Sequence, residues 1–550
     1  MPQDTQLPVD LVHWLLAVAP LVVLLVLLVG LRWKAPEAGP IGLFVAGGIA
    51  LVAFQTPWDT LAVAGAKGVW DALFILYVIW PALFLYRVAD RAGAFVALRE
   101  GIERFSNNEV FLVLGFSWVF ASFLQGITGF GAPIAIVAPL LIAIGVRPIY
   151  AVVLPLIGHA WANLFGTLAV AWLATLTVID LEDQVATAFQ TATLLWIPNL
   201  MAGVAIAWLF GRRAAVLHAL PMILIISGIH GGGQLLLTLW NPVLATFLVA
   251  TVALVALYPL SRWERYSEPA ENIPDRPAMG ESVEEAEHDR EEFEAEEPEP
   301  VMGLAMALMP YVVLTVLTVG VLTIGPIEQA LERPEVGLSF PAVETGLDVS
   351  REAEDPYSPF APLTHPGTFL LAAAIVAWVV YRARGYYERW ERRAEDTEEI
   401  VPGVIGDAVP ASIAVVVFLS MSAVMDHSGQ TTVLAQGIAD VAPPLLYAGT
   451  ANGIGLLGSF MTSSNTSANI LFSPLQQTVA AAEGLAEPTI IAAHHAGGAI
   501  GNSISPANVV LGTGTAGIVG QEGAVLRKTL PWALAAAVVT GVGTLLLLLL

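Results

Sequence analysis

Apolar runs of about 20 residues recur along the chain and constrain its fold more than any other feature. The first covers Leu11 to Leu31 and the last covers Pro531 to Leu550. A helix of that length crosses a ~30 Å hydrocarbon layer. Of all residues, 56% are hydrophobic and 13% are charged, well below the roughly 25% typical of soluble domains. The sequence therefore predicts a polytopic membrane protein and excludes a cytosolic globular one.

Helix breakers and charges divide the chain into separate apolar segments. We predict membrane segments near 11–31, 40–56, 62–86, 110–124, 132–146, 149–176, 186–211, 214–229, 234–258, 302–325, 366–383, 403–426 and 529–550, and an apolar but broken region from Val433 to Ile518. The predicted fold class is all-α, with about 12–14 transmembrane helices in two related halves and with re-entrant or broken segments.

An acidic stretch separates the two predicted halves. From Ser267 to Pro300 the sequence is dominated by Glu, Pro and Asp, and it has too few large apolar residues to offset its ordering entropy by burial. We therefore expect an N-terminal membrane half at 1–258, a disordered cytoplasmic linker at 259–300 and a C-terminal membrane half at 301–550.

Basic residues indicate the orientation, because they gather in alternate loops. They occur at Arg32 and Lys34, at Arg87 to Arg104, at Arg147, at Arg212 and Arg213, at Arg262 and Arg265, at Arg382 to Arg393, and at Arg527 and Lys528. The positive-inside rule places these loops in the cytoplasm and the N-terminus outside a plasma membrane. Residues 1–10 hold no Lys or Arg, which is unlike a signal peptide.

Charge and cysteine content exclude several classes of function. The 23 Lys and Arg stand against 47 Asp and Glu, a net charge of −24, which argues against nucleic acid as a partner and suggests a salt-rich, halophilic cytoplasm. The chain has no cysteine, so thiol chemistry, disulfides and Cys-ligated metals are excluded. We expect no cofactor and no metal centre. Assembly into a homo-oligomer stays open.

The first unusual segment runs from Ser122 to Pro133, with the sequence SFLQGITGFGAP, and continues to Asn163. Gly126, Gly129 and Gly131 followed by Pro133 do not suit a continuous helix. Non-helical backbone inside a membrane occurs where it lines a protein-enclosed or water-filled cavity. Close helix packing by small residues is the alternative interpretation.

The second unusual segment runs from Gly458 to Asn469, with the sequence GSFMTSSNTSAN, and continues to Pro506. Small hydroxyl and amide side chains are costly in lipid unless they face polar groups. A polar loop outside the bilayer is the alternative. The two segments match in order: Ser122 with Ser459, Pro139 with Pro474, Pro148 with Pro488, and 158–163 with 498–503.

Interrupted segments at corresponding places in two halves predict a transporter whose substrate binds where the breaks meet. The candidate substrate-binding residues offer side-chain donors or exposed backbone: Gln125, Thr128, Gly129, Gly131, Asn163, Ser464, Asn465, Thr466, Asn469, Gly497 and Gly498. The candidate ion-coupling residues are His159, His494, His495 and Asp426, since ionisable groups within membrane segments are functional candidates. Hydrogen-bonded core histidines and a water-facing Asp426 are the alternatives.

Two further charged features have structural interpretations. Lys67 and Asp71 lie four residues apart on one predicted helix face, so we expect them to pair with each other. Arg147, before Pro148, is interpreted as a cytoplasmic topology anchor.

At these segments the sequence resembles the L-lactate permease family. The resemblance lies in 123–136, in Gly145 to Ala151, in Met425-Asp-His-Ser-Gly429, and in Thr462 to Gln476 with Gly497-Gly498, Ile504-Ser-Pro506 and 516–520. It implies a multi-spanning secondary carrier of small monocarboxylates such as lactate and glycolate, with a coupling cation and re-entrant hairpins.

The sequence departs from the family pattern at charged positions. Gln125 and Asn465 stand where family members usually carry acids, Asn502 where they carry a Lys, and His159 and His494 where they carry amides. The loss of two acids favours either Na⁺ held by carbonyls and hydroxyls or a histidine-based proton path, so both H⁺ and Na⁺ stay open.

Two other classes of function compete with a coupled carrier. The same polar breaks could line the pore of an anion channel or passive facilitator, which would not accumulate solute against a gradient. A membrane enzyme is less favoured, since no His-Glu-x-x-His or Gly-x-Ser-x-Gly motif occurs within the apolar segments.

Overall fold

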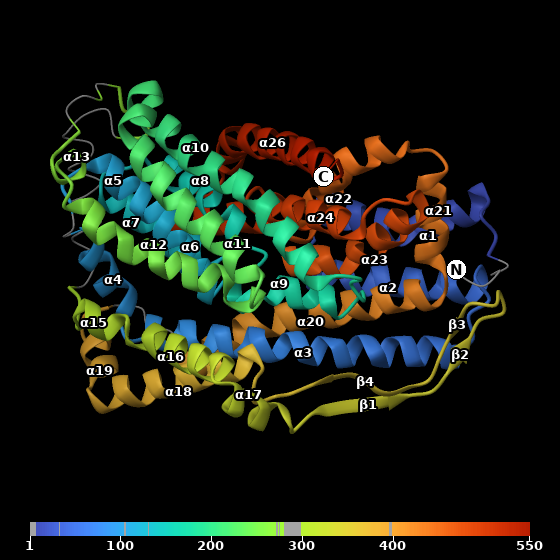
Figure 1. The fold of residues 1–550 in the computed structure, drawn as a ribbon. Coiled ribbons are helices and arrows are strands. Elements are labelled where there is room, and N and C mark those ends of the chain that lie inside the picture. The colour runs from blue at the N-terminus through green and yellow to red at the C-terminus, as the bar shows by residue number, and fades with distance from the viewer. Residues whose placement is uncertain are drawn as a thin grey trace.

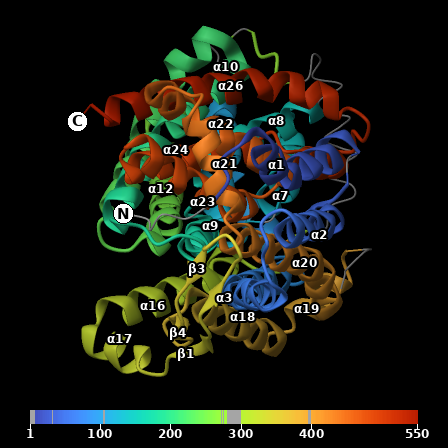
Figure 2. The same cartoon turned by 90° about the vertical axis from the view of Figure 1, so that its right-hand side faces the viewer.

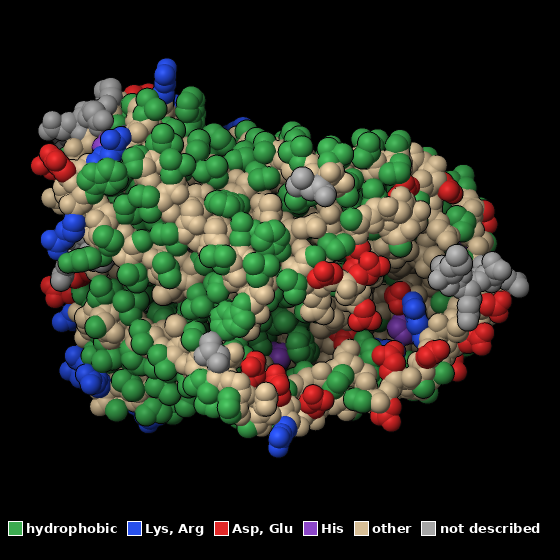
Figure 3. All heavy atoms as spheres, in the orientation of Figure 1, with side chains coloured by type: hydrophobic (Ala, Val, Ile, Leu, Met, Phe, Trp, Pro, Cys, Tyr) green, Lys and Arg blue, Asp and Glu red, His purple; other side chains and the backbone are tan. Residues whose placement is uncertain are grey.

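The computed structural model describes residues 7–31, 33–103, 106–129, 131–270, 273, 275–279, 299–394 and 399–549. It is a bundle of helices that run roughly parallel to one long axis, with one irregular β-hairpin along its side (Figure 1). Lys and Arg side chains gather at the end of the bundle around α13 and α19, and most Asp and Glu side chains lie on the opposite half of the same face (Figure 3). We call the first the basic end and the other the acidic end.

The first half of the chain contributes most of one side of the bundle. Its helices are α1 (Leu11–Leu25) with η1 (Val26–Gly30), α2 (Ala35–Val52), α3 (Trp58–Asp90), α4 (Ala94–Glu103), α5 (Glu109–Leu114), η2 (Gly115–Phe120), α6 (Ala121–Ile127), α7 (Ala132–Ala143), α8 (Pro148–Gly158), η3 (Ala160–Ala162), α9 (Gly166–Leu176), α10 (Gln184–Ser227), η4 (Gly228–Gly232), α11 (Gly233–Thr238), η5 (Pro242–Leu244), α12 (Ala245–Ser261) and α13 (Glu264–Ser267). Helix α10 kinks at Gly211 and Arg212, whose backbone is non-helical.

The second half begins with a short helix and a hairpin and ends with broken helices. Its elements are α15 (Leu304–Ala307), α16 (Met309–Thr323), α17 (Gly325–Glu332), β1 (Val336–Phe340), β2 (Val343–Glu344), β3 (Ser350–Arg351), β4 (Glu354–Phe360), α18 (Pro366–Ala383), α19 (Tyr386–Glu391), α20 (Ile400–His427), α21 (Gln430–Ala439), α22 (Pro444–Thr462), α23 (Asn465–Glu483), α24 (Glu487–Asn502), α25 (Pro506–Thr515) and α26 (Glu522–Leu547).

Seen along the bundle axis, two groups of helices lie on opposite sides of the bundle, with further helices between them (Figure 2). Helices α3, α16, α18, α19 and α20 lie together with the hairpin, while α8, α10, α22, α24 and α26 form the other group. The first group is held by α3, which packs along both α18 and α20. At their contact Gly68 of α3 touches the backbone of Ser420, since a Cβ there would lie 2.5 Å from its Cα. In the second group α24 packs against α10, α22 and α23.

Membrane-spanning helices are numerous, as predicted. Among the described residues, 9 helices are long and apolar enough to cross a membrane, or up to 11 if each of two bent pairs counts as one span. Much of their outer surface is apolar (Figure 3). Several other apolar segments of the sequence are arms of re-entrant hairpins or half-helices, because Gly, Pro and polar residues interrupt them.

The segment between 326 and 366, which joins the predicted membrane segments 302–325 and 366–383, holds the two-part β-hairpin. Strand β1 pairs antiparallel with β4, with Leu338 opposite Tyr357, and β2 pairs with β3, with Val343 opposite Arg351. The hairpin lies along α3 (Figure 1) and attaches to it through side chains. Trp70 Nε1 donates to the Ser358 carbonyl at 3.3 Å, and Thr60 Oγ1 donates to the Glu344 carbonyl at 3.2 Å.

The expected pairing of Lys67 with Asp71 is wrong, because each side chain instead contacts the hairpin. Lys67 Nζ lies 2.7 Å from Glu354 Oε1 and 4.6 Å from the centre of the Tyr357 ring. The Tyr357 hydroxyl donates to Asp71 Oδ2 at 2.7 Å. Sequence spacing placed the two residues on one face of α3, but β4 fills that face and supplies a partner to each. Burial raises the pKa of the Tyr357 hydroxyl, with the Asp71 carboxylate adding to the rise.

Part of the predicted acidic linker packs against the basic end. Ala270, Ile273 and Ala278 are buried, and the Arg147 N–H donates to the Ala278 carbonyl at 2.9 Å. Arg147 thus lies at the basic end, in the loop between α7 and α8. The Glu-rich run 280–298 lies outside the described residues.

Candidate functional site where two hairpins and two broken helices meet

The first hairpin consists of α5, η2 and α6 as one arm and α7 as the other. Its tip is non-helical because Gly129 (φ +55°) and Gly131 (φ +85°) adopt left-handed conformations that favour glycine, and Pro133 starts the return helix. Thr128, the residue after α6, donates its Oγ1 hydroxyl to the Leu124 carbonyl at 3.0 Å. Both ends of the hairpin lie at the basic end, where Val146 forms a β-bridge with Met279.

The second hairpin consists of α22 and α23. Its tip is Ser463, which adopts a left-handed conformation (φ +55°), and Ser464, which caps α23 by accepting the Ser467 N–H at 3.2 Å. At the far end of α23, Gln477 Nε2 donates to the Asp180 carbonyl at 2.7 Å, and Glu487 accepts the Glu182 N–H at 3.0 Å. This hairpin therefore opens toward the acidic loop between α9 and α10.

Each hairpin is followed by a broken helix. Helix α8 ends at Gly158, passes through η3 and resumes as α9, with a bend of 53°. Helix α24 ends at Asn502 and the chain resumes as α25 at Pro506. The predicted match between 158–163 and 498–503 falls on these two breaks. Hairpin plus broken helix is thus repeated, once open to each end of the bundle, the arrangement expected of inverted repeats.

The two repeats interlock through side-chain amides. Asn163 Nδ2, beside the first break, donates to the Ala499 carbonyl of α24 at 3.2 Å. Asn469 Nδ2, on the second hairpin, donates to the Ala171 carbonyl of α9 at 2.9 Å. A Cβ on Gly131 would lie 2.4 Å from Leu511 of α25, so the first tip touches the helix after the second break. The structure therefore brings the predicted hairpin and break residues to one region.

Several polar atoms of this region have no hydrogen-bond partner in the part of the chain that the structure describes. They are Asn465 Nδ2, Asn469 Oδ1 and Ser473 Oγ on α23, His494 Nε2 on α24, and Ser505 Oγ in the second break, all buried. Buried polar atoms are nearly always paired, so this set makes the region a candidate place for water, an ion or a solute, although unpaired atoms also occur elsewhere, as at Asn199 and His230. Among the described residues, the buried charged side chains are Lys67 and Asp71, which contact the hairpin; the breaks themselves are lined by neutral groups.

The candidate glycines have different surroundings. A Cβ on Gly498 would lie 2.3 Å from Asn465 Oδ1, and a Cβ on Gly129 would lie 2.3 Å from Thr167 Oγ1, so both glycines let a polar side chain approach the backbone. A Cβ on Gly166 would lie 3.2 Å from Gln125 Nε2, which places Gln125 beside the first break. Gly497 instead packs α24 against α22, with the Asn452 carbonyl 1.8 Å from its Cβ position.

The three candidate histidines are buried but differ in their partners. His495 lies 2.8 Å from Thr175 Oγ1 through Nε2 and 3.3 Å from Thr191 Oγ1 through Nδ1. Thr191 donates to the Thr187 carbonyl at 2.7 Å, so it accepts from His495, and Thr175 can donate to the other ring nitrogen. A neutral His495 is thereby satisfied. His159 Nδ1 bonds the Pro155 carbonyl and leaves Nε2 for another partner.

Asp426 is not part of this region. It lies in the last turn of α20 at the acidic end, where Oδ2 accepts from Arg351 of β3 at 2.6 Å, and its side chain is 41% exposed. We expected Asp426 to be an ionisable group within a membrane segment. The structure instead places it at a water-facing position next to the hairpin. The neighbouring His427 bonds the Ala423 carbonyl at 2.9 Å.

Some polar residues of the region were not singled out from the sequence. Gln476 donates to the Ala451 carbonyl at 2.8 Å, accepts from the Tyr447 hydroxyl and lies 3.5 Å from His494 Nδ1. Thr175 and Thr191 are also in contact with a candidate residue, His495. Their only signal in the sequence is a single polar residue within an apolar helix, which is too common to stand out.

Two interlocked hairpin and broken-helix units within a bundle of membrane spans define a polytopic membrane transporter. The family model described as L-lactate permease matches residues 13–550. The chain belongs to the L-lactate permease family, and is therefore a transporter of small organic anions in a cell membrane.

Known permeases are similar to this chain along almost their full length. An L-lactate permease of Halalkalibacterium halodurans is 28% identical over 97% of this chain and 96% of its own length. The glycolate permease GlcA of Escherichia coli is also 28% identical, over 97% of this chain and 95% of its own. Among solved structures, the YdaH transporter of Alcanivorax borkumensis matches with a TM-score of 0.42 and 17% identity over 89% of this chain and 87% of that one.

Proposed function

We propose that the chain is a secondary active transporter of a small 2-hydroxymonocarboxylate such as lactate or glycolate, coupled to H⁺ or Na⁺. The observation that carries this proposal is the set of buried, unpaired and uncharged polar atoms on α23 and α24 of the second unit, which suits a small polar solute. The two named relatives, a lactate and a glycolate permease, handle anions that share a carboxylate and a 2-hydroxyl.

Helix ends supply the charge that the side chains lack. Helices α7, α23 and α25 all begin at a tip or a break, whereas the first turn of α9, at Thr167, Leu168 and Ala169, is left-handed. The N-terminus of a helix carries a partial positive charge and free N–H groups, so it binds a carboxylate without a fixed cation. We assign the substrate site to Gln125, Thr128, Asn163, Ser464, Asn465, Thr466 and Asn469, with the backbone at Gly129, Gly131 and Gly498. Gly497, the remaining candidate, packs against α22 and is less suited. Gly498 leaves the room that the Asn465 amide needs.

The coupling cation has two candidate positions. Helices α6, α8, α22 and α24 end at the same tips and breaks, and carbonyls at helix C-termini bind Na⁺ in broken-helix transporters. For H⁺, His159 and His494 each have a ring nitrogen left over, whereas the neutral His495 ring is satisfied by Thr175 and Thr191. Asp426, paired with Arg351, is the least suited of the four candidates.

Uptake of labelled lactate into proteoliposomes, with H⁺ and Na⁺ gradients imposed separately, tests the proposal. We expect accumulation against a lactate gradient with one of the two cation gradients, collapsed by the matching ionophore. Equilibration without accumulation would instead indicate a passive facilitator or channel. If H⁺ is coupled, His159→Gln should change the pH dependence of uptake, and an unchanged profile together with Na⁺-driven accumulation would assign coupling to Na⁺.

The orientation we propose has the basic end in the cytoplasm and the N-terminus outside. Because the chain has no cysteine, single cysteines report sidedness without background. A membrane-impermeant maleimide added to whole cells should label Leu445→Cys at the exposed start of α22, and should label Asn107→Cys, exposed before α5, only after permeabilisation. The reverse pattern would invert the topology.

A further inference from the structure

A second group of buried polar atoms lies beside the first unit, on helices that the assigned substrate site does not use. It consists of Asn199 of α10, His230 of η4 and Gln234 of α11, all fully buried. Asn199 Nδ2, His230 Nε2 and Gln234 Oε1 have no hydrogen-bond partner within the described ranges of the chain. His230 lies in a π-helical turn, Gly228–Gly232, a feature that is frequent at functional sites.

Tryptophans connect this group to both the first break and the first hairpin. The His230 ring stacks on Trp161 of η3, with the ring centres 4.5 Å apart and the planes at 29°. Trp118 of η2, on the first hairpin, meets the same ring edge-on at 5.6 Å. Trp161 Nε1 also donates to Ser122 Oγ of α6 at 3.0 Å. The broken segment and the hairpin therefore pack around His230.

The hydrogen bonds that are present determine what the unpaired atoms can do. An indole N–H only donates, and Trp118 Nε1 lies 2.9 Å from Asn199 Oδ1, so the Asn199 amide N–H groups point elsewhere. His230 Nδ1 lies 3.4 Å from the same oxygen and bonds it only if it carries the ring proton, so Nε2 of the neutral ring keeps a lone pair. Gln234 Nε2 donates to Thr246 Oγ1 at 3.1 Å, which leaves Oε1 as an acceptor.

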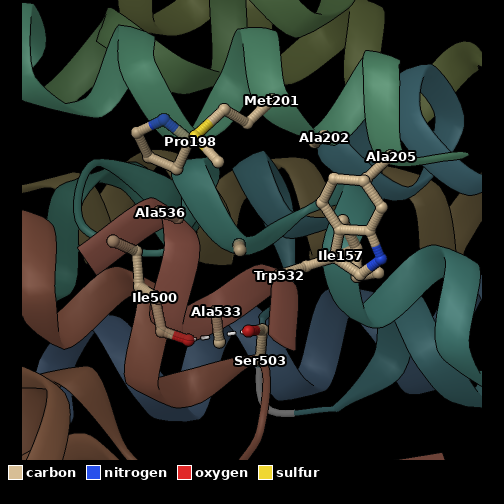
Figure 4. Close-up of a pocket in the computed structure, with 11 residues that line it drawn as sticks. Ile157, Pro198, Met201, Ala202, Ala205, Ile500, Ser503, Trp532, Ala533 and Ala536 are labelled. Carbon is tan, nitrogen blue, oxygen red and sulfur yellow. Dashed lines mark hydrogen bonds between the residues drawn. The ribbon is translucent and has the colours of Figure 1, made fainter. Parts of the chain in front are cut away.

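Another face of α10 is apolar. Pro198 and Met201 line a small pocket there, against α26 and the ends of α8 and α24 (Figure 4). A polar residue of its wall, Ser503, already donates its hydroxyl to a backbone carbonyl of α24 at 2.6 Å. Asn199 lies about 100° around the helix from Pro198, so its side chain faces His230 rather than this pocket.

We propose that an ordered water molecule binds between Asn199 and His230, accepting from Asn199 Nδ2 and donating to His230 Nε2. The two side chains offer unpaired donors beside an unpaired acceptor. A cation cannot accept from the amide and an anion cannot donate to the ring nitrogen, whereas water does both. Gln234, one turn along from His230, offers a third partner, and about two to four are usual for a buried water. The water thereby fixes the ring on which Trp161 of the broken segment rests.

X-ray radiolysis of the purified full chain, read by mass spectrometry, tests this proposal. Ionising radiation converts a bound water into a hydroxyl radical in place, so the side chains around it are oxidised even where bulk solvent has no access. Phe210 is fully buried on the same helix, about 16 Å from Asn199. We expect Trp161 and Trp118 to be oxidised at least about fivefold faster than Phe210, each rate being normalised to that of the unfolded chain.

The double variant Asn199→Leu/His230→Phe removes both partners of the water at similar volume. It should lower the oxidation of Trp161 to the level of Phe210. Asn107→Leu makes the same amide-to-apolar change at an exposed position and should leave the oxidation of Trp161 unchanged.

Three results would overturn the proposal. The first is protection of both tryptophans in the wild-type chain, which needs no variant to fold. The second is undiminished oxidation of Trp161 in a folded double variant. The third is oxidation of Trp118 that is lost when lactate is added, since the solute would then occupy the position. Labelling is read without transport, so the failure of the proposed transport function would not affect it.

Discussion

The proposed function can be tested most directly at individual side chains beside the tips and breaks. Asn465 combines a buried position on the second tip, an Oδ1 next to Gly498 and Ser459, and an unpaired Nδ2. This is the geometry of a donor that awaits a partner. His495, equally buried, is already satisfied by two threonines, which is the geometry of a structural residue.

Asn465→Leu should lower lactate uptake at least about tenfold, because one lost hydrogen bond to a charged group costs about 1.5–3 kcal/mol. Initial uptake rates in proteoliposomes measure this, with gel filtration as the check on folding. Asn107→Leu makes the same change at an exposed position and should leave uptake unchanged. Full activity of a folded Asn465→Leu protein would remove Asn465 from the site.

Gly498→Ala should also reduce uptake strongly. The added Cβ would lie 2.3 Å from Asn465 Oδ1, closer than atoms approach, so the amide must move away from its present position. Gly453→Ala, on α22 with nothing within 4 Å of its Cβ position, is the control and should behave as wild type. Equal uptake rates in the two variants would contradict the close approach of Asn465 to the α24 backbone.

At the scale of elements, the β-hairpin is attached to helices α3 and α20 by a small number of side chains. Lys67 is 2% exposed, and it contacts both Glu354 and the Tyr357 ring. The hairpin is also held to α20 by Arg351 and Asp426. Both ion pairs join the hairpin to helices of one group, so we interpret it as a brace for that group.

Lys67→Met should loosen the hairpin by about 1–3 kcal/mol, since Asp71 and Glu354 then lose their nearest positive charge. Limited trypsin digestion measures this as faster cleavage after Arg351, by about tenfold for ~1.4 kcal/mol. Lys34→Met removes an exposed lysine at the other end of the bundle and should leave that cleavage rate unchanged. An unchanged rate in Lys67→Met would show that the remaining backbone hydrogen bonds suffice.

Across the complete chain, the net charge of −24 at pH 7 predicts a requirement for salt. Like charges repel and added salt screens this repulsion within about 10 Å at 0.1 M. The melting temperature of the purified protein should therefore rise by several degrees between low salt and 1 M KCl. Deleting 281–298, a Glu-rich run, should preserve uptake and weaken the salt dependence. Equal melting temperatures at all salt concentrations would refute the halophilic interpretation.

The sequence was sufficient to predict the class of protein, a polytopic membrane transporter, and the positions at which its helices break. Runs of apolar residues require lipid, and Gly129, Gly131 and Ser464 interrupt helices through their own backbone and side-chain preferences, which are local properties. The residues of both tips and of both broken helices could be identified for the same reason. The weak match between 158–163 and 498–503 also indicated that the two units are related.

Contacts between distant segments could not be read from the chain. Lys67 and Asp71 were predicted to pair because their spacing on a helix can be read from the sequence. The contacts with Glu354 and Tyr357 could not be predicted, since the hairpin lies more than 280 residues further along the chain. His494 and His495 are neighbours in the sequence, but they differ in their hydrogen bonds. The helices packed around α24 supply partners to the His495 ring and leave Nε2 of His494 unpaired. Local patterns determine where a helix breaks. Packing determines which buried polar groups find partners and which are left for a solute.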